Sequence, residues 1–232
     1  VVGTVGTQTL VISGGSGTVS SANAATYSSS GINVGTLTLG NGSNGGLAAN
    51  YTLTGGTHQL TVNQRPLNAT LARQYDGTTN AAGSDLSSFD ALQGGETLTL
   101  SGSGTAANDN VANGISVSSL GSLALVNGTG LASNYSLNSA AINITQRVLN
   151  SSGSKTYDAN TNALAGAITL SNLVSGEALN HSGTATISSA NAGSYTISNL
   201  SGISIADGSG GAASNYTLTG GTHNFTVNRR VV

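Results

Sequence analysis

The chain has 232 residues, of which only 6% are charged, and its formal net charge is -2. Six Lys and Arg residues cannot form a basic surface for phosphate groups, so we expect no nucleic acid partner. The absence of cysteine excludes disulfides and cysteine-based metal sites. No apolar run approaches the roughly 20 residues of a membrane-spanning helix, so we expect no membrane insertion.

An internal repeat with a period of about 82 residues is the main feature of the sequence. The segment Asn50–His58 recurs letter for letter at Asn215–His223, and a looser copy, Asn134–Asn138, lies between them. A second marker, Tyr75-Asp76-Gly77, returns as Tyr157-Asp158-Ala159. The repeat therefore extends over essentially the whole chain.

These markers divide the chain into three parts. We predict a truncated repeat over 1–65, holding the rear two-thirds of a unit, and complete repeats over 66–147 and 148–232. Because the first unit lacks the Tyr-Asp-Gly part and the chain has neither methionine nor a signal peptide, we expect an internal segment of a longer protein. Junctions are expected near Arg65-Pro66, where Pro66 has a fixed φ, and near Arg147-Val148.

Within each repeat the pattern predicts short strands separated by turns. The glycine-rich stretches Gly40–Gly46 and Asp207–Gly211 are typical of tight turns. Strands are predicted where small polar and apolar residues alternate with a two-residue period, as in Thr97–Leu100, Ser194–Ile197 and Asn224–Val227. No amphipathic helix is evident, and only Ser88–Leu92 could form a single helical turn.

All seven tyrosines occupy positions that are tyrosine in another repeat. The chain has two phenylalanines and no tryptophan, so we expect tyrosine rings to supply the largest pieces of each core, with hydroxyls reaching polar partners at its edge. A unit of this size buries a modest core, so contacts between neighbouring repeats are expected to add stability. The equivalent sets are Tyr75 with Tyr157, Tyr27 with Tyr195, and Tyr51 with Tyr135 and Tyr216.

The order of these motifs resembles a known family. Tyr75–Ala81, then Gly95-Glu96, Ala132–Leu137 and a closing Ile142–Thr145 strand resemble the YDG and MBG-type ("mostly beta, glycine-rich") repeats of large bacterial adhesins. These include haemagglutinin-like proteins exported by two-partner secretion. The resemblance implies an extracellular location at a Gram-negative cell surface and a stalk or adhesive role, and it transfers no catalytic residue. Ala159, which replaces the glycine, departs from the pattern.

Few side chains suit catalysis or metal binding. His58 and His223 share a repeat position and His181 has no carboxylate cluster, so a structural role is favoured for all three. Calcium would need several neighbouring carboxylates, and the only candidates are Asp85, Asp90 and Asp109. No serine stands in a pattern with a base and an acid. We therefore predict no catalytic, cofactor-binding or metal residue, and no enzyme.

Two polar features have simpler interpretations. Asp76 and Asp158 are each expected to cap their own turn, with Arg73 or Lys155 as charge partner. Eleven Asn-x-Ser/Thr sites occur, among them Asn50, Asn134 and Asn215. Chance would give about seven such sites, so they do not by themselves indicate glycosylation.

We therefore predict an all-β protein of tandem elongated modules of about 82 residues in a rod, each a β-sandwich or β-grasp-like sheet. A continuous β-solenoid is the alternative. The expected function is a stalk or spacer segment of a bacterial surface adhesin or biofilm-matrix protein; the alternative is that the modules bind a glycan or host-surface ligand. Expected partners are neighbouring repeats of the same chain and, through other regions, a host-surface or matrix glycan. We expect a monomer.

Overall fold

The computed structural model describes all residues, 1–232, and its regular elements are strands and single turns of 3₁₀ helix, joined by turns and loops. It forms two compact units, one of residues 1–67, 91–98 and 125–138, and one of residues 68–90, 99–124 and 139–232. The all-β prediction is confirmed. None of its helical turns has the length and apolar character needed to cross a bilayer.

Strands of the first repeat pair as three two-stranded ribbons, β1 with β5, β2 with β4 and β3 with β6. Their bounds are β1 (Leu10–Gly14), β2 (Thr18–Val19), β3 (Ala25–Tyr27), β4 (Ile32–Asn33), β5 (Thr38–Asn41) and β6 (Leu60–Val62). The glycine-rich stretch after β5 is a turn, as predicted, in which Asn44 and Gly45 have φ of 55° and 80°. Positive φ favours glycine and asparagine, which explains the composition of this stretch.

The middle repeat contains a six-stranded sheet in the order β8-β11-β12-β14-β7-β9, together with the ribbon β10-β13. The bounds are β7 (Arg65–Gln74), β8 (Asn80–Ala82), β9 (Leu86–Phe89), β10 (Leu98–Ser101), β11 (Ser103–Ala106), β12 (Ala112–Ser119), β13 (Ala124–Asn127) and β14 (Tyr135–Thr145). The helical turn considered for Ser88–Leu92 is wrong, because Phe89 extends β9 and pairs with Ala69 of β7. Pairing of the backbone with an adjacent strand overrides the weak local preference of this segment.

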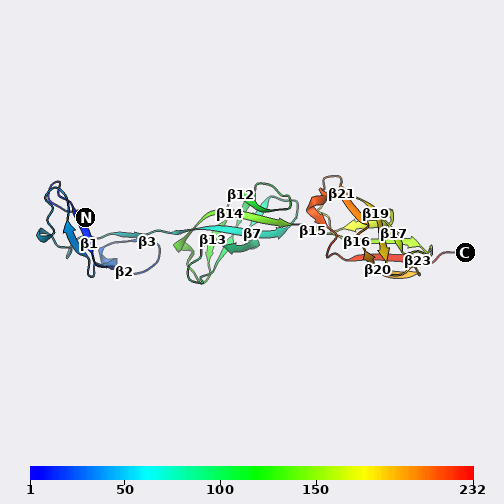
Figure 1. The fold of residues 1–232 in the computed structure, drawn as a ribbon, viewed down its shortest axis with the longest axis horizontal. Helices are drawn as coiled ribbons and strands as arrows, with labels where there is room; N and C mark the ends of the chain where they lie inside the picture. Colours follow the sequence, from blue (N-terminus) through cyan, green and yellow to red (C-terminus); the bar gives the residue numbers. More distant parts are fainter. The chain divides into compact units, whose positions relative to one another are not determined.

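The last repeat has the order β17-β19-β20-β23-β16-β18, and β21 pairs with β19. The bounds are β15 (Arg147–Val148), β16 (Asn150–Thr156), β17 (Asn162–Leu164), β18 (Ile168–Ser171), β19 (Leu179–Ile187), β20 (Gly193–Asn199), β21 (Ile203–Asp207), β22 (Tyr216–Thr217) and β23 (His223–Asn228). These strands occupy the yellow-green to red part of Figure 1. Its first long strand, β16, runs parallel to its last, β23, from Ser151 opposite His223 to Thr156 opposite Asn228.

Six 3₁₀ turns complete the fold, and three of them immediately precede the tyrosine of the Asn-Tyr motif. The turns are η1 (Ser29–Gly31), η2 (Ala48–Asn50), η3 (Gly83–Asp85), η4 (Ala132–Asn134), η5 (Ala165–Ala167) and η6 (Ala213–Asn215). Apart from β15, whose Arg147 pairs with Tyr216 of β22, each strand pairs only with strands of its own repeat. The continuous solenoid is therefore wrong, because its coils would pair with one another. The limits 1–65, 66–147 and 148–232 stay predictions.

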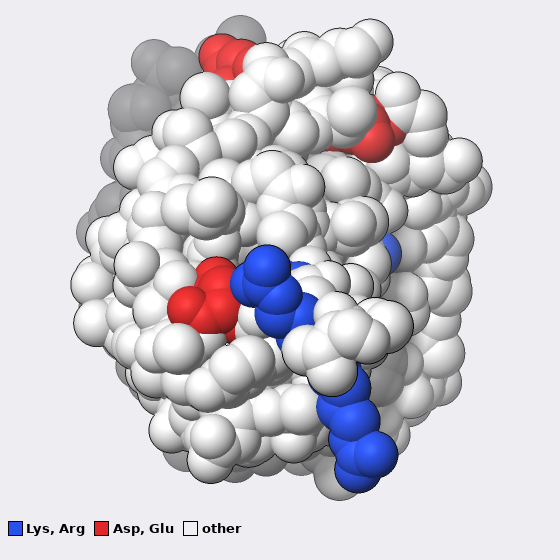
Figure 2. Space-filling view, turned by 90° about the vertical axis from the view of Figure 1, so that its right-hand side faces the viewer, with Lys and Arg blue, Asp and Glu red and all other residues white.

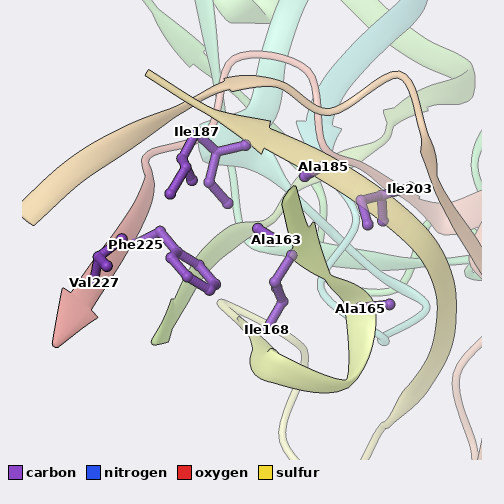
Figure 3. Packing of buried hydrophobic residues seen from close by; sticks show 9 residues of the cluster. Ala163, Ala165, Ile168, Ala185, Ile187, Ile203, Phe225 and Val227 are labelled. Carbon is purple, nitrogen blue, oxygen red and sulfur yellow. The ribbon is translucent and has the colours of Figure 1, made fainter. Parts of the chain in front are cut away.

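A hydrophobic core of buried residues lies in the last repeat and is shown in Figure 3. Phe225 and Val227 of β23 are 1% and 2% exposed, whereas Asn224, which precedes Phe225 in the same strand, is exposed. This confirms the predicted alternation along the strand. The remaining buried members are small or branched aliphatic residues: Ala163, Ala165, Ile168, Ala185, Ile187, Ile197 and Ile203.

The prediction for the tyrosines needs correction. Phe225 and aliphatic residues form this core, and Tyr195 packs against it only partly buried. Three tyrosines are almost fully buried, with exposures of 5% for Tyr75, 4% for Tyr135 and 1% for Tyr216, but Tyr157 is 38% exposed. Equivalent positions therefore differ in burial, and their surroundings decide which ring is covered.

Charged side chains are sparse on the surface. Figure 2 shows a face on which a few Lys, Arg, Asp and Glu stand among uncharged residues. This follows from the composition, in which charged residues make up 6% of the chain. Hydroxyl, amide and backbone groups therefore provide most of the polar surface.

Candidate functional site: the joint between repeats

The Tyr-Asp-Gly turn is held by its own aspartate, as predicted. Asp76 Oδ1 accepts a hydrogen bond from Thr78 N at 3.0 Å, and Asp158 Oδ1 accepts one from Asn160 N at 3.2 Å. Asp76 is paired with Arg73, and Lys155 Nζ lies 2.9 Å from Asp158 Oδ1. The hydrogen bond from Lys155 lowers the pKa of the Asp158 carboxyl. Both exposed carboxylates therefore have a local structural use.

The histidines contact backbone carbonyls of their own repeats. Nε2 of His58 lies 3.0 Å from Leu53 O, and Nε2 of His223 lies 2.8 Å from Leu218 O. Nε2 of His181 lies 3.0 Å from Ile168 O and 3.1 Å from Ala165 O. These contacts agree with the structural interpretation of all three histidines.

The acids considered for calcium are not gathered in one place. Asp90 accepts hydrogen bonds from Asn68 N at 2.9 Å and from Asn68 Nδ2 at 2.7 Å. Asp85 lies in η3, and Asp109 lies in the turn before β12. The structure brings no three His, Asp or Glu side chains together in a metal-binding arrangement.

A tyrosine hydroxyl is fixed in the same way in all three repeats. In each repeat, the hydroxyl accepts a hydrogen bond from a backbone N–H. It donates to the side chain of a Gln or Glu that lies three residues after the residue supplying that N–H. The N–H contacts are Val5 to Tyr51 at 3.1 Å, Gln93 to Tyr135 at 3.2 Å, and Val174 to Tyr216 at 3.1 Å. The acceptors are Gln8 Oε1 for Tyr51 at 2.6 Å, Glu96 for Tyr135, and Glu177 Oε2 for Tyr216 at 2.7 Å. This cluster ties the end of a 3₁₀ turn to the turn before a strand.

Glu177 receives a second tyrosine, which belongs to the preceding repeat. Tyr75 Oη donates to Glu177 Oε1 at 2.6 Å, and the rings of Tyr75 and Tyr216 meet edge to face with centroids 5.5 Å apart. Burial, followed by the hydrogen bond to Glu177, raises the pKa of Tyr75 to about 12. Burial also raises the pKa of Tyr216. One carboxylate thus joins two repeats through two phenol groups.

The backbone of Tyr75 is held on both sides. Its N–H donates to Thr145 O at 2.9 Å, and its carbonyl accepts from Arg147 Nη1 at 3.4 Å. Arg147 also donates through Nε to Asn172 O at 2.6 Å and through Nη2 to Asn172 Oδ1 at 2.9 Å. Arg147 therefore links the Tyr-Asp-Gly turn of one repeat to a loop of the next. We call this set of contacts, centred on Tyr75, Arg147 and Glu177, the joint.

The asparagine before the motif tyrosine reaches back to the preceding repeat. Asn215 Oδ1 accepts from Val111 N at 2.9 Å, its Nδ2 donates to Asn110 Oδ1 at 3.0 Å, and Gln146 Nε2 donates to Ser214 O at 3.1 Å. The same three bonds recur between the first and middle repeats: Ala24 N to Asn134 Oδ1 at 2.8 Å, Asn134 Nδ2 to Asn23 Oδ1 at 3.0 Å, and Gln64 Nε2 to Ser133 O at 3.1 Å. The Asn-Tyr motif therefore marks contacts between repeats.

Sequence reasoning singled out Tyr75, the Arg147-Val148 junction and the Asn-Tyr motif, but not the contacts that they make. It did not single out Asn110, Val111 or Asn172. Asn134 and Asn215 were considered as sequon asparagines, yet both donate Nδ2 to the neighbouring repeat, and Asn215 is 1% exposed. A sugar would have to attach to that nitrogen. The sequence offered one signal for these contacts: an asparagine and a Gly-Glu pair recur together in successive repeats, and no catalytic residue recurs with them.

Comparison with known families agrees with the pattern of motifs. A family model for the YDG domain matches residues 58–144 and 139–223. The chain belongs to the YDG domain family. Comparisons with curated proteins and with solved structures gave no match.

The three residues of the YDG motif have separate tasks in this chain. Tyr75 contributes its ring and hydroxyl to the joint, whereas Asp76 caps the turn. Gly77 has a φ of +73°, a left-handed conformation that suits glycine. Through Tyr75, this copy of the motif therefore contacts the next YDG repeat.

Proposed function

We propose that this chain is a structural spacer whose YDG repeats are coupled through their joints, as a stalk segment of a bacterial surface adhesin or biofilm-matrix protein outside the cell. The observation that supports the proposal is that the recurring residues are the ones that connect repeats. Tyr75, Asn215, Tyr216 and Glu177 make contacts between repeats or support them. They do not surround a cleft with reactive groups.

Coupling of this kind is energetically significant for small repeats. Stabilities of roughly 0.05–0.15 kcal/mol per residue give about 4–12 kcal/mol for a unit of about 82 residues. A hydrogen bond to a charged group contributes about 1.5–3 kcal/mol, and a neutral one about 0.5–1.5 kcal/mol. The several bonds of one joint are therefore comparable with a sizeable share of one repeat's stability. Neighbouring repeats should consequently support each other, as in other repeat proteins.

Uncharged, hydroxyl-rich surfaces also suit a spacer. The low content of charged residues leaves no field to attract a charged ligand. One shallow hollow of about 310 Å³ lies among Ala24, Thr26, Thr61, Gln64 and Ser133, and no aromatic ring lines it. A second hollow of about 380 Å³ is lined by Tyr195 and Phe225, but Phe225 is 1% exposed and Tyr195 packs against the core. Aromatic rings are the usual hydrophobic anchors of binding interfaces.

The experiment is a length series. Chains carrying one or two additional copies of residues 148–230 would be compared with the natural chain by small-angle scattering. A spacer predicts that the maximum dimension grows by a constant increment with each copy. In parallel, the natural chain would be applied to a glycan array and to host cells. Saturable binding by the repeats, or increments that vary or vanish, would contradict the spacer.

A further inference from the structure

Gly77 of the Tyr-Asp-Gly turn lies directly against the next repeat. Its φ is +73°, and Ala159, at the same position of the following repeat, adopts almost the same conformation with a φ of +63°. An alanine is therefore accommodated by this turn. Backbone conformation alone does not explain why position 77 is glycine.

The neighbour of Gly77 supplies the reason. A Cβ at this position would lie 2.8 Å from Val174 Cγ1 and 3.4 Å from Glu177 Oε1, both in the next repeat. Carbon atoms in contact normally stay about 3.5–4.0 Å apart, so a methyl group would collide with Val174. Ala159, by contrast, is exposed.

Val174 has little freedom to withdraw. Its N–H donates to Tyr216 Oη at 3.1 Å, and Tyr216 is bound in turn to Glu177. A valine side chain is also stiff about χ1, because two carbons branch from its Cβ. Moving Val174 would therefore disturb the turn that presents Glu177 to Tyr75.

The residue at the Val174 position varies between repeats although its backbone contact does not. Val5 and Gln93 occupy the equivalent positions, and each donates its N–H to the motif tyrosine of its own repeat. The backbone contact is thus constant, and the side chain at this position is free to differ.

We propose that the side-chain sizes of residues 77 and 174 decide which YDG repeats can follow one another, and we call this pairing rule the code. Gly77 accepts a repeat that presents Val174. The turn with Ala159 fits a YDG repeat that has a residue smaller than valine at the Val174 position and keeps a glutamate at the Glu177 position. This inference rests on the coupled spacer proposed above and adds that the order of repeats is encoded at their joints.

The test uses the full chain, whose lack of cysteine allows clean placement of two spin labels. Ser116→Cys and Ser204→Cys place labels at exposed positions of β12 and β21. Pulsed electron resonance then gives the distribution of distances across the joint. Gly77→Ala is expected to broaden this distribution and to speed exchange of the Val174 amide at least tenfold. Val174→Ala alone is expected to keep the narrow distribution, and the double variant Gly77→Ala/Val174→Ala is expected to restore it.

Ala159→Gly is the matched control, since it changes the same turn position without a neighbour of the Val174 kind in this chain. It is expected to leave the distance distribution unchanged. An unchanged distance distribution in Gly77→Ala would overturn the code. So would a double variant Gly77→Ala/Val174→Ala that does not recover the narrow distribution, or that stays unfolded where Gly77→Ala unfolds the protein. Ligand binding by the repeats would instead refute the spacer and leave these distances unaffected, so the two failures are distinguishable.

Discussion

Tyr75→Phe isolates the hydrogen bond that joins two repeats. The substitution removes the hydroxyl that donates to Glu177 Oε1 at 2.6 Å and keeps the ring that packs against Tyr216. A hydrogen bond to a charged group is worth about 1.5–3 kcal/mol. Glu177 is half-buried, so solvent screening favours the lower end of this range. We expect a loss of about 1.5 kcal/mol, roughly tenfold in the equilibrium between docked and undocked repeats.

Tyr157→Phe is the matched control. Tyr157 occupies the same place in its turn, but its side chain is 38% exposed. Surface substitutions usually change stability by less than about 0.5 kcal/mol. The comparison therefore separates the joint from any general effect of losing a tyrosine hydroxyl in this turn.

Urea unfolding followed by far-ultraviolet circular dichroism provides the assay. With intact coupling the middle and last repeats should unfold in a shared transition, and Tyr75→Phe should lower its midpoint or separate it into two. Equal midpoints for Tyr75→Phe and Tyr157→Phe would refute the assignment of the joint. A loss of stability in Tyr75→Phe that is confined to the last repeat's own core would refute it as well.

Three further outcomes follow from the same contacts. The folded pKa of Tyr75, about 12, lies above the unfolded value of about 10, so its contribution to stability is complete below pH 10 and is lost as pH rises towards 12. In an absorbance titration of phenolate, this late step should disappear in Tyr75→Phe. Asn215→Ala leaves the half-buried Val111 N–H without its acceptor and should cost about 1 kcal/mol in urea unfolding, whereas Asn50→Ala at the exposed equivalent position should be nearly neutral. Phe225→Ala removes the largest side chain of the core cluster and should cost about 3–5 kcal/mol, measured as a lowered thermal midpoint of the last repeat.

The sequence by itself determined the local features of this protein. Alternation of polar and apolar residues predicted strands such as Asn224–Val227, and glycine and asparagine predicted the turn after β5. The capping of their own turns by Asp76 and Asp158 was also predicted. Each of these features depends on residues a few positions apart, so a short stretch of sequence contains all the interactions that decide it.

Only the tertiary structure decided which members of an equivalent set make contacts between repeats. Tyr75 and Tyr157 share one motif, but only Tyr75 meets a glutamate, Glu177, 102 positions further along the chain. Likewise, the parallel pairing of β16 with β23 joins strands at opposite ends of one repeat. Burial and hydrogen bonding across such separations depend on the neighbouring surface that folding brings into contact. No local pattern around a single tyrosine contains that information.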